Sequence, residues 1–233
     1  MVPTSAPTPP QGFQRARSQE QRAQRRRLIL ETAAAMLTEM PVAEVSLNEL
    51  SRRVGLAKSN VLRYFESREA VLLELLHTAS QEWLEHLDPA LGRTVNPDAE
   101  LVGRSRAVAA TAATTLAARP VLCDLLSAQA AVLERNVSAQ VAAEYKRAAI
   151  SDVEALADMI GGRLPELGAA NAPRFAAAAI MTTGALWAHA HPSAAMLAAY
   201  EAHPELAAMR LDFTESLRQF LEVLLAGLLA GWE

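Results

Sequence analysis

Apolar residues recur along the chain in steps of three and four, the spacing that buries one face of a helix. No segment shows the alternation of apolar and polar residues that is typical of a half-buried strand. Beyond about residue 88 one helical segment follows another, separated by breaks that contain proline or glycine. The pattern therefore predicts an all-α fold.

The first predicted helix begins within an arginine-rich stretch, RARSQEQRAQRRR, which places six arginines between positions 15 and 27 beside a single acid. Ser18 and Gln21 have the spacing of a capping box, so we expect the helix to begin there and to stop at Pro41. The preceding residues are rich in Pro, Ser, Thr and Gly, and residues 1–17 are predicted to form a disordered basic tail.

Three further helices are predicted next. A capping box of Ser46 and Glu49 opens the second helix, and Gly55 suits the left-handed residue that ends a helix. The third helix is expected over about 57–65, and Ser67 caps a long fourth helix with an apolar inner stripe. Two short helices joined by a glycine turn, with another helix in front, indicate a helix-turn-helix unit within residues 18–81.

The helical wheel of the third helix separates a buried side, with Val61 and Phe65, from an outward polar side. Ser59, Asn60 and Arg63 lie on the outward side. Arginine can give two hydrogen bonds to guanine, and asparagine can pair with the edge of adenine. The outward side therefore predicts contact with DNA bases, and the alternative is a helical corner that has only a structural role.

Nine residues in and around this unit are predicted DNA contacts. Lys58 and Tyr64 are placed to reach phosphates or bases, and Ser46 and Asn48 begin a helix whose positive end favours a phosphate. Arg68 starts the fourth helix and is expected to hold the same DNA strand. The predicted set comprises Ser46, Asn48, Lys58, Ser59, Asn60, Leu62, Arg63, Tyr64 and Arg68.

Charge is divided unevenly between the two ends of the chain. Of the 22 Lys and Arg residues and 26 Asp and Glu residues, residues 1–70 contain 11 and 7, which leaves 11 and 19 for the remainder. A basic first third favours a polyanionic partner at that end. The arginines at 15–27 are either a solvated tail or a flexible arm that contacts the DNA backbone or minor groove.

The stretch from about Arg22 to Ser80 resembles the DNA-binding domain of TetR-family transcriptional regulators. The resemblance lies in LILETAAAML and VSLNELSRRVGLAKSNVLRYFESREAVLLELL, above all in G-[VL]-x-K-x-x-[LV]-x-x-[YH]-F followed by [ST]-[KR]-E. It covers about a quarter of the chain. Two positions depart from the family pattern: Ala57 replaces the usual Ser or Thr cap, and Leu62 replaces a frequent tyrosine.

The resemblance implies an all-α homodimer that regulates transcription. Its N-terminal domain would bind a near-palindromic double-stranded DNA operator. Residues 82–233 would form a helical effector-binding and dimerisation domain, in which a small apolar or amphipathic molecule releases the DNA. A repressor is the favoured reading.

The C-terminal region shows no catalytic or metal-binding spacing, so no enzyme activity, metal or cofactor is predicted. Cys123 lies among leucines and is expected to be a buried structural thiol. The segment FAAAAIMTTGALWA at 175–188 favours close helix packing, with an apolar ligand cavity as the alternative. The candidate ligand-binding residues are Leu126, Gln129, Tyr145, Met181 and Trp187.

The last helix has an apolar stripe, from Leu217 to Leu229, that is wider than one neighbouring helix would cover. Together with residues 175–188 it is expected to form a symmetric dimer interface. The single cysteine, the absence of an apolar leader and the short apolar runs predict a cytoplasmic protein with no membrane partner.

Two other functions remain open on these residues. One is a small-molecule-binding protein or enzyme whose helix-turn-helix unit is only structural. The other is an architectural protein that binds DNA without sequence preference.

Overall fold

The structure, a computed structural model, describes residues 11–231, and within this range it contains helices and no strand. The all-α prediction is confirmed. The elements are α1 (Gln11–Glu39), η1 (Val42–Glu44), α2 (Leu47–Val54), α3 (Lys58–Val61), α4 (Arg68–Thr94), α5 (Leu101–Ala117), α6 (Pro120–Ala128), η2 (Gln129–Leu133), α7 (Ala139–Arg163), η3 (Pro165–Leu167), α8 (Gly168–Ala190), α9 (Ala194–Ala202), α10 (Pro204–Ala207) and α11 (Phe213–Leu229).

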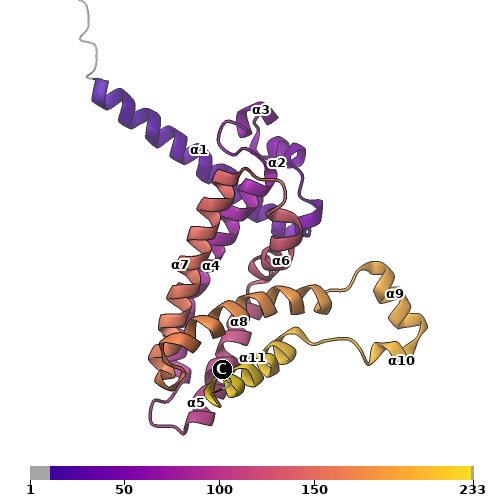
Figure 1. Cartoon of the computed structure of the whole chain (residues 1–233). Helices are drawn as coiled ribbons and strands as arrows, with labels where there is room; N and C mark the ends of the chain where they lie inside the picture. Colours follow the sequence, from indigo (N-terminus) through magenta and orange to yellow (C-terminus); the bar gives the residue numbers. More distant parts are fainter. Residues whose placement is uncertain (1–10, 232–233) are drawn as a thin grey trace, which may run out of the picture.

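The N-terminal helices form a small unit at one end of α4 (Figure 1). Within this unit, the predicted helix ends at Ser46, Gly55 and Ser67 are confirmed. The Ser46 hydroxyl accepts a hydrogen bond from the backbone N–H of Glu49, and the Ser67 hydroxyl accepts one from Ala70, both at 3.1 Å. Gly55 ends α2 in the left-handed conformation, with φ 72° and ψ 29°, which glycine adopts without a steric penalty.

The predicted start of the first helix at Ser18 is wrong, because α1 is already helical at Gln11 and projects from the body of the molecule (Figure 1). Gln, Arg, Glu and Ala all favour helix, so the run from 14 to 27 continues the helix through the apparent capping box. Residues 11–17 of the predicted tail are therefore helical, and residues 1–10 lie outside the described residues. The predicted stop is confirmed, since α1 ends at Glu39, two residues before Pro41.

The third helix is shorter than predicted. Regular helix covers only Lys58–Val61, and the chain then continues to Phe65 in tighter turns. In these turns the N–H of Arg63 donates to the carbonyl of Asn60 at 3.3 Å, and the N–H of Tyr64 to that of Val61 at 2.9 Å. Hydrogen bonds between residues three apart are typical of the tightened last turn of a helix. Helix α3 therefore ends after one regular turn, because so short a helix gains little from further hydrogen bonds.

Helix α4 is a single element from Arg68 to Thr94 and continues through Pro89. Proline removes only one backbone hydrogen bond, and the flanking Leu87 and Leu91 are completely buried. Their packing holds the helix on both sides of the proline. The predicted domain boundary between residues 81 and 82 falls inside this helix.

In the C-terminal part α5, α6 and α7 pack against α4, while α8 packs against α6 and α7, and α11 against α5 and α8 (Figure 1). Cys123 is fully buried as predicted, and burial raises the pKa of its thiol to about 12. Between α8 and α11 the chain extends outward as α9 and α10, which contain no buried residue. Among the described residues no single helix is long and apolar enough to cross a membrane; one pair, α5 with α6–η2, reaches that length and composition but is bent by 92°.

Candidate nucleic-acid interface and helical cavity

The outward side of α3 is polar and free, as the helical wheel predicts. Val61 and Phe65 are 0% and 4% exposed and anchor the turn from behind. Lys58, Asn60 and Arg63 are exposed, and within residues 11–231 their side chains make no hydrogen bond or ion pair. These groups are therefore available to an external partner without breaking an internal contact.

A polar cleft joins this surface to α1. Arg22 and Arg25 of α1 and Arg63 and Tyr64 of the α3 turn line a cleft of about 600 Å³. The side chains of Arg15 and Arg17 lie outside what the structure describes. Three guanidinium groups around one cleft form a positive site of the kind that binds phosphate groups. Because this part of the arginine stretch is helical, its side chains are held beside α3 rather than carried on a flexible tail.

Arg26 has a different role from its neighbours, which the sequence did not indicate. Its guanidinium forms a two-pronged ion pair with Glu74 of α4, and it donates a hydrogen bond of 2.7 Å to the carbonyl oxygen of Tyr64. It also lies 4.2 Å from the centre of the Phe65 ring, a favourable cation–π distance. Arg26 therefore fastens the end of the α3 turn to both α1 and α4.

Replacing Arg26 by alanine is expected to lower stability by about 1–2 kcal/mol, because a charged hydrogen bond to a partly buried carbonyl and a bidentate ion pair are lost together. Thermal unfolding at fixed protein concentration would measure the loss. Arg27→Ala is the matched control, since Arg27 is exposed on the next position of the same helix. Equal effects of the two substitutions would contradict the role of Arg26.

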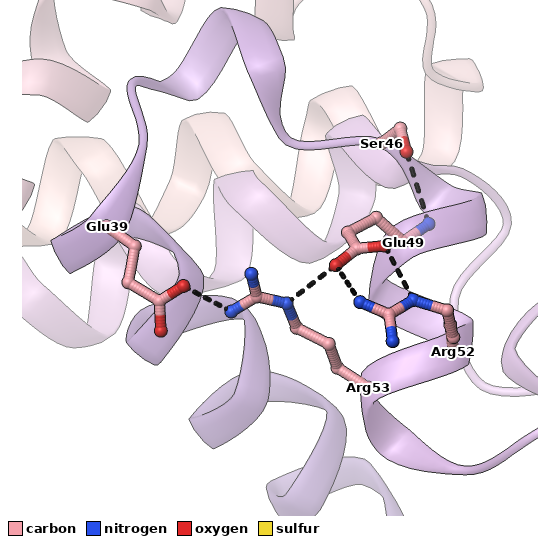
Figure 2. Close-up of polar contacts among 5 residues, drawn as sticks. All are labelled: Glu39, Ser46, Glu49, Arg52 and Arg53. Atoms are coloured by element: carbon pink, nitrogen blue, oxygen red, sulfur yellow. Dashed lines mark hydrogen bonds and ion pairs between the residues drawn. The ribbon is translucent and has the colours of Figure 1, made fainter.

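A network of ion pairs fixes α2 against α1 (Figure 2). Glu49 accepts hydrogen bonds from Arg52 at 2.6 and 2.9 Å and from Arg53 at 2.9 Å, and Arg53 also reaches Glu39 of α1 at 2.6 Å. The hydrogen bonds from Arg52 and, to a smaller extent, from Arg53 stabilise the charged carboxylate and lower the pKa of Glu49 to about 2. The two arginines of α2 therefore have internal counter-ions, unlike Lys58 and Arg63.

The other predicted DNA contacts are placed as follows. Ser46 and Asn48 are exposed at the N-terminal end of α2, Leu62 is 41% exposed, and Tyr64 is half-buried against the cleft. The prediction for Arg68 is not supported by the structure. Its guanidinium points inward and donates a hydrogen bond of 3.0 Å to the carbonyl oxygen of Val42, because α4 begins against the η1 turn.

Ala57 occupies the N-cap position of α3 and provides no side-chain hydrogen bond. We expect Ala57→Thr to stabilise the protein by about 1 kcal/mol, because a threonine hydroxyl accepts a hydrogen bond from an otherwise unpaired N–H of the first turn. The melting temperature would rise by roughly 2–4 °C for a chain of this size. Ala57→Val is the control, because valine has the shape of threonine without the hydroxyl and should give no such gain. Equal shifts of the melting temperature in both variants would refute capping as the cause.

A cavity of about 550 Å³, open to the surface, lies between α4, the α6–η2 segment, α7 and α8. Four of the five candidate ligand-binding residues line it: Leu126, Gln129, Tyr145 and Met181. Trp187 does not, and this part of the prediction is wrong. Its ring stacks on His191 at 3.8 Å and meets the edge of Phe213 at 4.9 Å, because it faces the α11 side of α8.

The cavity combines an apolar wall with a few polar groups. Trp83, Leu84 and Ile180 contribute to the wall. On the polar side, His77 Nδ1 lies 3.0 Å from an Asp152 carboxylate oxygen. The second polar group is Glu134, whose carboxylate accepts hydrogen bonds from Lys146 at 2.8 Å and from Gln129 at 3.0 Å. Apart from Gln129, the sequence analysis missed these polar residues, because the pairs join separate helices and no local pattern brings them together.

Helix packing and the cavity both use the small residues of α8. A side chain at Gly184 would place its Cβ 2.7 Å from the carbonyl oxygen of Leu126, so α8 and α6 meet there backbone to backbone. Ala177 and Met181, on the adjoining side of α8, border the cavity. The segment 175–188 therefore packs closely against α6 and also borders the cavity.

A wider groove of about 950 Å³ lies on the surface between α1, α4 and the start of α6. Its charged residues include the Arg26–Glu74 pair, which is already satisfied internally. Within the described range no group of three or more His, Cys, Asp or Glu residues is arranged to hold a metal ion.

A helix-turn-helix unit with a free polar face, joined by a continuous helix to an all-helical domain with a cavity between its helices, defines a DNA-binding regulator with a helical C-terminal domain. The family model of bacterial regulatory proteins of the tetR family matches residues 29–75, and the model of the tetracyclin repressor-like C-terminal domain matches residues 77–231. The chain belongs to the TetR family of transcriptional regulators.

Individual proteins of the family are only partly similar to this chain. The HTH-type transcriptional regulator EthR of Mycobacterium tuberculosis is 42% identical over 48 residues, which are 21% of this chain and 22% of that protein. A TetR regulator from Rhodococcus sp. RHA1 has the same fold, with a TM-score of 0.56, 15% identity and coverage of 91% of this chain and 98% of its own. The multidrug-binding protein EbrR, complexed with imidazole, has a TM-score of 0.50 at 16% identity, with coverage of 86% and 94%.

Proposed function

We propose that this protein binds an operator as a homodimer through α3, and that a small molecule in the cavity between α4, α6–η2, α7 and α8 releases it from DNA, which would make it a repressor. The observation that carries the proposal is the outward face of α3. Lys58, Asn60 and Arg63 are exposed without internal partners, while Val61 and Phe65 hold the turn in place from behind.

The proposed DNA contacts are of two kinds. Asn60 and Arg63 would read base edges in the major groove, with Ser59 and Leu62 beside them. Lys58, Tyr64 and the α1 arginines Arg22 and Arg25 would hold the phosphate backbone, and so would Ser46 and Asn48 at the start of α2. Since the α1 arginines are in a helix beside the recognition turn, we place them on the backbone next to the base-reading groups.

The proposed dimer interface uses the outward faces of α8 and α11. Met181 on α8 is 68% exposed, and Phe220 and Val223 on α11 are 57% and 72% exposed. Large apolar groups at this exposure on adjoining helices favour a partner surface. One recognition turn reads only a few base pairs, so two copies related by a two-fold axis provide the length that operator specificity needs.

The cavity supports a ligand response. It lies between four helices, it is mostly apolar, and it has a small number of polar groups, which is typical of small-molecule sites. The fold is shared with a protein described as multidrug-binding. The effector would be an apolar or amphipathic molecule.

Selection of bound sequences from a pool of random duplexes tests the DNA-binding proposal. We expect a near-palindromic motif whose two halves are about one helical turn apart. Affinity for the selected duplex should fall steeply with salt, because several phosphate contacts release counter-ions. Recovery of unrelated sequences with equal affinity would favour an architectural protein, and no retained duplex at low salt would favour a helical protein whose N-terminal unit is only structural.

A further inference from the structure

The segment between α8 and α11, residues 192–212, extends away from the rest of the protomer as an arm that contains α9 and α10 (Figure 1). The structure describes this arm throughout, and no residue in it is buried. The main packing contact of α9 is with α10, which belongs to the same arm. Helices of nine and four residues are at best marginal in water without tertiary packing. The arm therefore lacks, within its own protomer, the packing that stabilises such short helices.

The arm has large apolar side chains that are exposed in the protomer. On α9, Met196 and Leu197 are 46% and 36% exposed, and Tyr200 follows at the four- and three-residue spacing that places the three side chains on one face. Leu206 on α10 and Met209 shortly after it are 41% and 72% exposed. Apolar groups gathered on one exposed segment indicate a surface that binds another protein.

The base of the arm is fixed in direction by aromatic contacts. Trp187, near the end of α8, stacks on His191 and meets the edge of Phe213, with ring centres 3.8 and 4.9 Å apart. His191 directly precedes the arm and Phe213 directly follows it, so one buried indole joins its two ends. A segment held at both ends is preorganised, because it loses less conformational freedom on binding than a flexible loop does.

Resting on the proposed homodimer, we infer that the arm packs against the partner subunit and adds to the interface formed by the outward faces of α8 and α11. The protein that covers its apolar face is therefore a second copy of this chain. The arm is joined at both ends to the helices that present the exposed Met181, Phe220 and Val223, so it extends the same surface. It points away from α4 and α7 of its own protomer (Figure 1), and in a two-fold dimer through α8 and α11 its end reaches across to the partner.

Two substitutions in the arm test this inference and should leave the protomer folded, because both side chains are exposed. In a protein that carries Leu206→Ser and Met209→Ser, we expect the dissociation constant of the dimer to rise at least tenfold, as measured by sedimentation over a dilution series. The matched control carries Val102→Ser and Ile150→Ser, on α5 and α7, where the parent side chains are 61% and 57% exposed. Its dissociation constant should stay within twofold of the parent value.

Hydrogen exchange shows whether the partner covers the arm. The N–H groups of Leu197 and His203 donate to the carbonyl oxygens of Ser193 and Ala199 at 2.9 and 3.0 Å, so their exchange reports the opening of α9. In the parent protein, these two amides should exchange at least tenfold more slowly at concentrations above the dissociation constant than below it. Circular dichroism at the lower concentration should show that the protomer remains folded.

The outcomes separate the role of the arm from the proposed function. A protein that is monomeric at every concentration would contradict the proposed homodimer, and the role of the arm would fail with it. A dimer whose dissociation constant is the same in the parent and in the arm variant would overturn the role of the arm alone. So would a dimer in which the α9 amides exchange as fast as they do in the monomer.

Discussion

Replacing Arg63 by alanine is expected to remove most of the preference for the operator and to leave the fold and the dimer intact. Arg63 is exposed in the α3 turn, and within the described residues it has no counter-ion. A bidentate contact between arginine and guanine contributes about 1–3 kcal/mol of discrimination against the wrong base. The ratio of operator to non-specific affinity should therefore fall by on the order of 10- to 100-fold for each half-site.

Fluorescence anisotropy with the selected duplex and a scrambled one, at fixed salt, measures this ratio. Arg106→Ala is the matched control, since Arg106 is an exposed arginine on α5, in the C-terminal part. A parallel sedimentation measurement should find the same oligomeric state for parent and variant. An unchanged affinity ratio in Arg63→Ala would show that this arginine does not read bases.

The second large effect is expected at Gly184, where a side chain would enter the contact between α8 and α6. A Cβ there lies 2.7 Å from the Leu126 carbonyl oxygen and 2.9 Å from its carbon, and both are backbone atoms that a rotamer change cannot move. Gly184→Ala should therefore lower stability by about 1–3 kcal/mol, as overpacking of a well-packed core does. For a chain of this length the melting temperature should fall by roughly 2–12 °C.

Gly162→Ala provides the comparison for this prediction. Gly162 lies near the end of α7 with nothing within 4 Å of the added Cβ, so alanine should be neutral or slightly stabilising there. Both variants are compared at equal protein concentration, because association changes the apparent stability. A melting temperature of Gly184→Ala equal to that of the parent would mean that α8 and α6 separate easily at this point.

The parts of the fold that could be predicted from the sequence are those set by neighbouring residues. Ser46, Gly55 and Ser67 act on groups within three residues of themselves, and the structure has all three in the expected roles. The side of α3 that Val61 and Phe65 bury was predictable for the same reason. Pro89 does not end α4, because the free energy that the proline costs is smaller than the stabilisation from the buried leucines on either side of it.

The parts that could not be predicted depend on residues far apart in the chain. Arg68 has the residue type of a phosphate contact, but Val42, 26 positions earlier, presents its carbonyl to it. Arg26 resembles the other arginines of its run until Glu74 of α4 is placed beside it. The polar groups of the cavity also come from separate helices, such as His77 of α4 and Asp152 of α7, so no periodicity of the sequence indicates them.

If the protein binds DNA and a small molecule as proposed, the unbroken course of α4 makes it a lever between the cavity and the duplex. Trp83 lines the cavity 15 residues beyond Arg68, a distance of about 22 Å at 1.5 Å per residue. A tilt of about 5° at the cavity would then displace the DNA end by roughly 2 Å. In a two-fold dimer the displacements oppose each other and sum to about 4 Å, more than the rise of one base step, about 3.4 Å. Small movements of the cavity walls around a bound molecule would thereby shift both α3 turns away from their operator half-sites.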